Sequence, residues 1–287
     1  MAEETAAGDS RQERNAVFGA GSTTIPGRSV LSDDFGYQTP VEAVPLPSNG
    51  VTYPVNSMLH GREVINIRAM TAKDEDVLTS RALIKQGTVI TRLLQNCIVD
   101  SGVNPDMMLS GDRNAVMVAV RITGYGADYN VEVDCPACSE RSKQSFNLAE
   151  LPIKRLQVPP TSEGSNEFEF ELPVTKQLVK FKFLTGRDEQ EIMKQQERAK
   201  KRGQAGNNLV TTRLLNQILS VGGVTDRGKI QLFVQNMPAR DSKALRDFID
   251  KNEPGVEMKS WMDCPNCYET SEVRLPLGAS FFWPEAD

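Results

Sequence analysis

The motifs Cys135-Pro136-Ala137-Cys138 and Cys264-Pro265-Asn266-Cys267 decide how this chain folds, because they hold four of its five cysteines. Two thiolates fill only half of a tetrahedral zinc shell, whereas two such motifs brought together complete it. About 125 residues separate Cys138 from Cys264, far more than the roughly 15 to 20 residues of a local zinc ribbon. We therefore predict that the fold brings both motifs to one shared site.

The residues that flank the motifs alternate between apolar and polar, as Tyr129–Val133 and Glu272–Leu275 do. This places each cysteine pair at a turn between strands, whereas a thioredoxin-type redox pair needs a helix that starts at the motif. We predict one structural Zn²⁺ per chain, because four thiolates leave no coordination position for water or substrate. Iron–sulfur or redox chemistry and a site without metal are the alternatives. The predicted ligands are Cys135, Cys138, Cys264 and Cys267.

Ser139 and Tyr268 follow the second cysteine of their motifs. Glycine is common at this position of such turns, because it adopts a left-handed backbone at no steric cost. We therefore expect the two turns to be less regular than a glycine-containing turn.

The two halves of the chain resemble one another in sequence. Three pairs of similar segments occur in the same order in both halves. The spacing from Asp112 to Cys135 also equals that from Asp241 to Cys264. Each half indicates strand, helix, helix, helix, strand, cysteine motif and strand, which favours a duplicated unit. The paired segments are Glu63–Thr71 with Gln177–Thr185, Thr91–Asn96 with Thr212–Gln217, and Asp112 and Ala115 with Asp241 and Ala244.

Local signals place the first helices and strands. Thr71 is a candidate helix N-cap, followed by Asp74 in the first turn, and this helix is expected to end near Gly87. Apolar residues recur at helical spacing over 89–98, which predicts a second helix. In the second half, Phe168–Leu172 and Leu178–Phe183 alternate around a short link, which predicts a hairpin.

These patterns predict an α+β fold of two pseudo-symmetric repeats, joined by a shared four-cysteine, zinc-ribbon-like site. The first repeat is expected over 45–152 and the second over 153–287, each with one cysteine knuckle. Residues 1–44 are dominated by Ala, Gly, Ser, Thr, Glu and Arg. Such a segment cannot bury enough apolar surface to fold alone, so we expect an extended N-terminal arm.

The composition argues against several classes of function. The formal net charge is −5, so no global charge attracts the chain to nucleic acid or to an anionic membrane. No stretch approaches the roughly 20 apolar residues of a membrane-spanning helix, and Met1–Thr5 lacks the features of a signal peptide. Reduced thiols in a cytoplasm are therefore expected. The basic end of a helix predicted over 188–202 indicates a solvated face rather than a phosphate-binding patch.

Catalytic signals are weak throughout the sequence. His60 is the single histidine and is expected in an exposed loop, so it does not indicate a nucleophile and its base. The segment Gly19–Thr24 lacks the Gly-Lys that binds phosphates in a P-loop. Cys97 falls on the apolar face of the 89–98 helix, which favours a buried small hydrophobe over a reactive thiol. We predict that the chain is not an enzyme and binds no small-molecule substrate.

Several of these segments, taken in order, resemble the baseplate hub protein family of contractile-tailed bacteriophages. The resemblance spans roughly residues 45 to 287, so the N-terminal arm lies outside it. It implies a structural or assembly role at the tail tip, without catalysis. The segments that carry it are Leu46–Gly50, Met70–Ser80, Ser110–Arg113, Arg121–Gly126, both cysteine motifs and Leu275–Pro284.

The resemblance also implies partners and a location. The expected partners are other baseplate hub or wedge proteins, or tail-tube proteins, in a virion assembled from proteins made in the host cytoplasm. The aromatic end Phe281–Trp283 is expected to fold back onto the core, with anchoring of a partner as the alternative. A zinc-stabilised adaptor or nucleic-acid-binding module of another complex is the rival interpretation.

Overall fold

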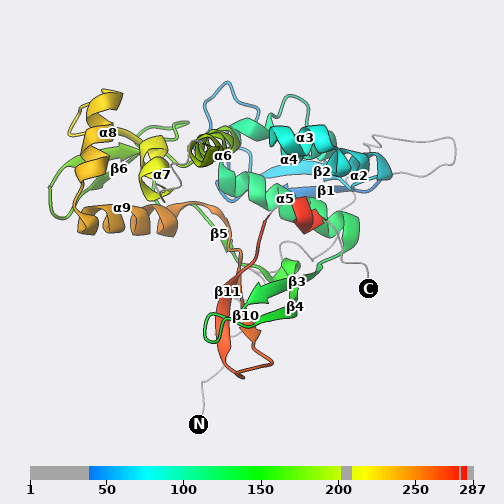
Figure 1. The fold of residues 1–287 in the computed structure, drawn as a ribbon. Helices are drawn as coiled ribbons and strands as arrows, with labels where there is room; N and C mark the ends of the chain where they lie inside the picture. Colours follow the sequence, from blue (N-terminus) through cyan, green and yellow to red (C-terminus); the bar gives the residue numbers. More distant parts are fainter. Residues whose placement is uncertain (1–38, 202–208, 278, 283–287) are drawn as a thin grey trace, which may run out of the picture.

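The computed structural model describes residues 39–201, 209–277 and 279–282. It contains helices and small antiparallel sheets, in agreement with the predicted mixture of helix and strand. Figure 1 shows two bodies side by side and a lobe of strands that projects from them. The N-terminal segment 1–38 lies outside the described residues.

The first body places helices against a two-stranded sheet. Strands β1 and β2 pair antiparallel, with Val41 opposite Arg68 and Pro45 opposite Val64. β1 therefore begins inside the segment 1–44 that the sequence assigned to the arm. The elements of this body are β1 (Val41–Pro45), β2 (Val64–Arg68), α2 (Ala72–Thr79), α3 (Arg81–Gln86), α4 (Val89–Cys97), η2 (Pro105–Met107) and α5 (Ser110–Tyr125).

The second body contains a three-stranded sheet in the order β6-β7-β8. The predicted hairpin is present, because Phe168 pairs with Phe181 and Glu171 with Leu178. The helix predicted over 188–202 is α6. The elements are β6 (Phe168–Glu171), β7 (Leu178–Phe181), α6 (Gly186–Lys201), α7 (Leu209–Gln217), β8 (Ile218–Val221), α8 (Arg227–Asn236) and α9 (Ala239–Asn252).

The projecting lobe consists of two hairpins from distant parts of the chain (Figure 1). Short strands and 3-10 turns connect the lobe to the bodies. The lobe strands are β3 (Asp128–Asp134), β4 (Arg141–Asn147), β10 (Lys259–Asp263) and β11 (Thr270–Arg274). The connecting elements are η3 (Leu148–Glu150), β5 (Ile153–Lys154) and β9 (Gly255–Val256), and η4 (Ala279–Phe282) follows the lobe as the last described element.

The helix expected from Thr71 to Gly87 is divided into α2 and α3. Ser80 has an extended backbone (φ −65°, ψ 104°), which ends α2 and caps α3. The predicted start is correct. Thr71 is the N-cap of α2, and its backbone N–H and hydroxyl both donate to Asp74, at 2.9 and 2.8 Å.

The same capping arrangement occurs at the start of α6. The backbone N–H and hydroxyl of Thr185 donate to Asp188 at 2.9 and 2.8 Å. A cation completes each cap. Arg68, the last residue of β2, lies 2.7 Å from Asp74, and Lys182, which directly follows β7, lies 2.8 Å from Asp188. These contacts fix the angle between strand and helix in both bodies.

A second pair of buried carboxylates ties a turn to the first turn of a helix. Asp112 of α5 accepts hydrogen bonds from the N–H and hydroxyl of Ser48, at 2.9 and 2.5 Å, and from the Tyr53 hydroxyl. Asp241 of α9 accepts from the N–H and hydroxyl of Thr175, at 3.0 and 2.8 Å. Both carboxylates are fully shielded from solvent.

Helix α5 connects the two bodies. Its N-terminal turn crosses the second body so closely that a Cβ added to Gly111 would lie 1.7 Å from the carbonyl oxygen of Pro254. A backbone bridge beside it pairs Leu109 with Thr185. One hydrophobic cluster includes buried residues from both bodies and the lobe, so the parts share a core.

The C-terminal segment folds back onto this core. The side chains of Phe281 and Phe282 are fully buried, as predicted for the aromatic end. The Phe281 ring packs edge-on against Tyr129, with centroids 5.1 Å apart, and the Arg121 guanidinium donates to the Phe281 carbonyl at 3.2 Å. Trp283 lies outside the described residues.

Candidate metal centre

The sulfur atoms of Cys135, Cys138, Cys264 and Cys267 all lie within 4.8 Å of one another. Two close contacts cross between the motifs: Cys135 Sγ is 3.8 Å from Cys267 Sγ, and Cys138 Sγ is 3.6 Å from Cys264 Sγ. The prediction that the fold brings the distant pairs together is therefore confirmed.

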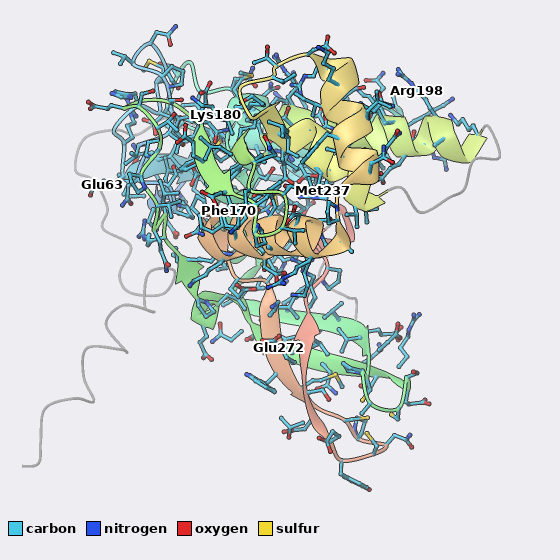
Figure 2. The ribbon with its side chains drawn as sticks, turned by 90° about the vertical axis from the view of Figure 1, so that its left-hand side faces the viewer. Glu63, Phe170, Lys180, Arg198, Met237 and Glu272 are labelled. Carbon is cyan, nitrogen blue, oxygen red and sulfur yellow. The ribbon has the colours of Figure 1, made fainter. Side chains whose placement is uncertain are left out.

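Strand pairing positions each motif. The β3–β4 hairpin carries the first motif at its tip and the β10–β11 hairpin carries the second. Figure 2 shows this lobe, with Glu272 of β11 labelled, projecting away from the helices. Each hairpin alone holds two sulfurs, so the site is complete only when the two hairpins meet.

The two turns have matching backbone hydrogen bonds. In the first, the Ser139 N–H donates to the Cys135 carbonyl at 2.8 Å, and in the second the Tyr268 N–H donates to the Cys264 carbonyl at 2.9 Å. Ser139 and Tyr268 have φ of 61° and 59°, the left-handed region where a side chain costs about 1 kcal/mol. Because neither turn has glycine at this position, both have backbone strain there. Their hydrogen bonds and φ angles nevertheless match.

Hydrogen bonds to sulfur favour the thiolate form at one ligand. The backbone N–H of Glu140 and then the side-chain amide of Asn266 lower the pKa of Cys138 to about 7. Asn266 reaches Cys138 from the opposite motif, with its Nδ2 3.7 Å from the sulfur. Sequence reasoning missed this residue, although its place between the two cysteines of the second motif was the available signal.

The neighbouring thiols oppose complete ionisation of the cluster. At Cys267 the backbone N–H of Glu269 lowers the pKa, but burial and the adjacent cysteines outweigh it and raise the pKa to about 12. Four thiolates this close repel one another unless a cation lies among them. The donor set is thus suited to a cation that holds all four sulfurs deprotonated.

The separations match one tetrahedral ion. Metal–sulfur bonds of about 2.3 Å place the corners of a regular tetrahedron about 3.8 Å apart. The two contacts between the motifs are 3.6 and 3.8 Å, and every S···S separation is within 4.8 Å. In a multinuclear cluster the thiolates bind different metal atoms, which separates the sulfurs further. An ion bound by all four sulfurs would have no open coordination position, so the arrangement suits a structural rather than a catalytic ion.

The remaining residues singled out in the sequence do not join this site. Cys97 is fully buried, and burial raises the pKa of its thiol to about 12, consistent with a core hydrophobe. His60 is half-buried rather than exposed, and its Nδ1 lies 2.6 Å from the Tyr53 carbonyl oxygen. Lys194 and Arg198 of α6 are solvent-exposed, and Figure 2 labels Arg198. Gly19–Thr24 lies outside the described residues.

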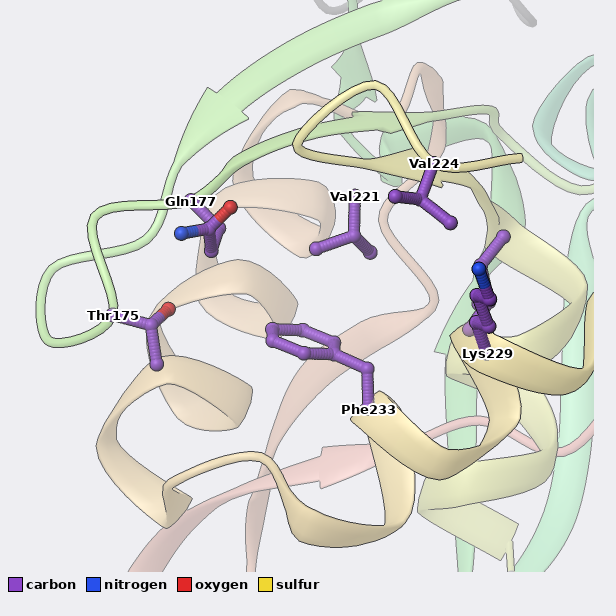
Figure 3. A pocket seen from close by; sticks show the side chains of 7 residues that line it. Thr175, Gln177, Val221, Val224, Lys229 and Phe233 are labelled. Carbon is purple, nitrogen blue, oxygen red and sulfur yellow. The ribbon is translucent and has the colours of Figure 1, made fainter. Parts of the chain in front are cut away.

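An open pocket of about 440 Å³ lies in the second body. Figure 3 shows Phe233 of α8 and Val221 of β8 facing it, across from Thr175 and Gln177. Among the described residues that line it, Lys229 is the one charged side chain. The pocket thus lacks a pair of groups for acid–base or nucleophilic chemistry.

A comparison with protein families matched residues 50–283 to the model described as T4 bacteriophage base plate protein. The chain belongs to this family. The match includes the first body from residue 50 onward, and so excludes β1, together with the second body, both hairpins of the lobe and all four clustered cysteines. Membership makes the chain a component of the virion tail and indicates a structural rather than catalytic role.

Neither the comparison with curated proteins nor that with solved structures found a match. In the part of the chain that the structure describes, no helix is both long enough and apolar enough to cross a membrane.

Proposed function

We propose that this baseplate protein is a structural component of the hub of a contractile phage tail, or a factor in its assembly. The match to the baseplate family over residues 50–283 is the observation that carries this proposal. The protein acts through contacts with other hub, wedge or tail-tube proteins and has no substrate or nucleic-acid ligand. It is made in the host cytoplasm and becomes part of the tail baseplate.

The four clustered cysteines are proposed to bind one Zn²⁺ per chain. A tetrahedral site of four thiolates between hairpin turns suits zinc, and the sulfur separations support a mononuclear centre. Structural zinc stabilises small zinc-finger peptides by roughly 10 kcal/mol or more. Here the ion would join two hairpins that belong to different halves of the chain.

The two halves are proposed to be copies of an ancestral unit. The matched caps at Asp74 and Asp188, the matched buried carboxylates at Asp112 and Asp241, and the alike cysteine turns support this. The proposed units are 45–152 and 153–287, each with one cysteine knuckle, preceded by an extended arm over 1–44.

Purified virions and tail assembly intermediates test the hub assignment. Mass spectrometry and cryo-electron microscopy of isolated baseplates are expected to place this chain at the central hub. Its presence in intermediates but not in finished baseplates would reduce the role to assembly. Location in the peripheral wedges, or absence from both fractions, would refute the proposal.

Metal analysis of the purified chain tests the zinc proposal. One zinc per chain is expected in the wild type and in Cys97→Ser, which is the control because Cys97 lies outside the cluster. Cys138→Ser and Cys264→Ser are expected to reduce the zinc content. Cobalt substitution should give the spectrum of a tetrahedral four-sulfur site; an iron cluster, or an unchanged metal content in these variants, would contradict the proposal.

A further inference from the structure

The backbone bridge between the two bodies suggests a contact that can repeat between molecules. The Ser110 N–H donates to the Leu184 carbonyl at 2.8 Å, and the Gly186 N–H donates to the Met108 carbonyl at 2.9 Å. Leu109 and Thr185 are the paired central residues. The bridge thus joins the residues that precede and begin α5 to those that precede and begin α6.

We call each three-residue segment of this bridge, Met108–Ser110 and Leu184–Gly186, an edge. The second body contains a segment that corresponds to the Met108–Ser110 edge. The N-cap of α5 is Leu109 (φ −53°, ψ 143°), and the N-cap of α9 is Pro238 (φ −53°, ψ 136°). Each N-cap precedes by three residues the buried aspartate of its helix, Asp112 or Asp241. Met237–Ala239 therefore has the backbone shape of the edge that is paired in the first body.

The first body carries a counterpart of the Leu184–Gly186 edge. Thr71 and Thr185 are both held by the carboxylate three residues later, so Met70–Ala72 has the same position before α2 as Leu184–Gly186 has before α6. Each body thus contains both kinds of edge.

One edge of each kind is unused. Within residues 39–201, 209–277 and 279–282, no hydrogen bond engages the N–H of Ala72 or Ala239, or the carbonyl of Met70 or Met237. Residues of the paired edges are also more buried than the corresponding residues of the unused edges. Met108, Leu109 and Leu184 are buried at 0, 2 and 0 % exposure, whereas Met70 and Met237 are half-buried and both alanines are exposed.

Proline at position 238 is compatible with such a pairing. The bridge uses the N–H that follows its central residue and the carbonyl that precedes it, so the central residue donates nothing to the bridge itself. Pro238 therefore loses no hydrogen bond in the central position. Its neighbours Met237 and Ala239 still offer the acceptor and the donor.

The unused edges lie at opposite ends of the pair of bodies. In Figure 1, α2 lies at one end, and α8 and α9 lie at the other. Figure 2 shows Met237 on the face of this second end. Complementary edges at opposite ends form a heterologous contact, in which one copy's surface docks on a different surface of the next.

We infer that the partner of these edges is a second copy of this chain. Met70–Ala72 of one copy pairs with Met237–Ala239 of the next, through the bridge that already joins the two bodies within each chain. The inference uses the correspondence of the halves proposed above. Its product is a head-to-tail series of molecules, which forms a ring if the rotation between copies closes and an open chain otherwise.

Proline substitutions test this pairing without disturbing the helices. Ala72→Pro and Ala239→Pro each remove one donor at the first residue of a helix, where proline is tolerated. The preceding residues, Thr71 and Pro238, already have extended backbones that accept a following proline. Ala72→Gly and Ala239→Gly keep the N–H and are the matched controls.

The readout is sedimentation of the zinc-containing full chain over a range of concentrations. Wild type and both glycine variants are expected to self-associate. Each proline variant is expected to associate about tenfold or more weakly, because it loses one intermolecular hydrogen bond and its pyrrolidine ring lies against the carbonyl oxygen that would have accepted that bond. An equal mixture of the two proline variants should form a dimer that grows no further, because each retains the edge that the other lacks.

Three outcomes would overturn the inference. The first is a wild-type chain that stays monomeric at its highest soluble concentration. The second is association that both proline variants leave unchanged. The third is a mixture of proline variants that is no more associated than each alone. Zinc content, measured on the same samples, separates these outcomes from failure of the proposed metal centre.

Discussion

Replacement of Gly111 by alanine tests how the two bodies are joined. The added Cβ would lie 1.7 Å from the Pro254 carbonyl oxygen and 2.9 Å from the Gly255 Cα, inside the 3.0 Å that real Cβ contacts respect. The backbone at β9 must therefore move away from α5 by at least about 1.3 Å. Overpacking that displaces backbone costs about 3 kcal/mol, which corresponds to a fall in Tm of roughly 6–12 °C for a chain of this size.

Gly124→Ala provides the matched control, because Gly124 lies in the same helix. Its added Cβ would meet the terminal methyl of Met70 at 3.0 Å, and this flexible side chain can move. Its effect on the free energy of unfolding should stay within about 1 kcal/mol, since alanine also favours the helix. Thermal unfolding of both variants decides the matter. Equal Tm values for the two would refute the close crossing of α5 and β9.

Three further changes address pH dependence, the turns and the C-terminus. Burial raises the pKa of Glu253 from 4.5 to about 7, so stability is full below pH 4.5 and is lost as the pH rises from 4.5 through 7. Glu253→Gln should abolish this decline and exceed wild type at pH 8 by about 3 kcal/mol in chemical denaturation. Ser139→Gly should raise the Tm by relieving about 1 kcal/mol of left-handed strain, and a lower Tm would contradict this. Phe281→Ala should cost about 3–4 kcal/mol, since the ring is fully buried; a loss below about 1 kcal/mol would show that the C-terminal segment is not anchored.

Local patterns predicted several elements because their causes are local. The Thr71 cap needs an aspartate only three residues away, and the strand alternation around Phe168–Leu172 depends on neighbouring side chains. The division at Ser80 was missed, because the apolar spacing continues across it while the backbone does not. Half-burial of His60 was missed as well, since its contact with the Tyr53 carbonyl arises from the shape of a loop.

The cysteine site was predicted more completely than its surroundings. Each Cys-x-x-Cys motif supplies only two of the four ligands of a tetrahedral shell, so the sequence predicted that the two motifs lie together in the fold. The position of Asn266 within its motif signalled that it lies near the site, but its hydrogen bond to Cys138 of the opposite motif depends on how the hairpins face one another. The sequence also did not predict that Asp112 and Asp241 accept buried hydrogen bonds. Their partners, Ser48 and Thr175, lie 64 and 66 residues away along the chain.

The sequence by itself determined which four cysteines cluster, most of the strands and helices, and the likeness of the two halves in sequence, because these depend on residue types and short spacings. The three helices predicted for the second half were wrong in number, since β8 (Ile218–Val221) and α8 (Arg227–Asn236) lie between α7 and α9. Only the tertiary structure decided how the halves meet, through the close approach of Gly111 to Pro254 and the bridge from Leu109 to Thr185. It also decided which backbone edges are left unpaired. The reason is physical: contacts between distant segments depend on the packing of the whole core, and no short stretch of sequence specifies that packing.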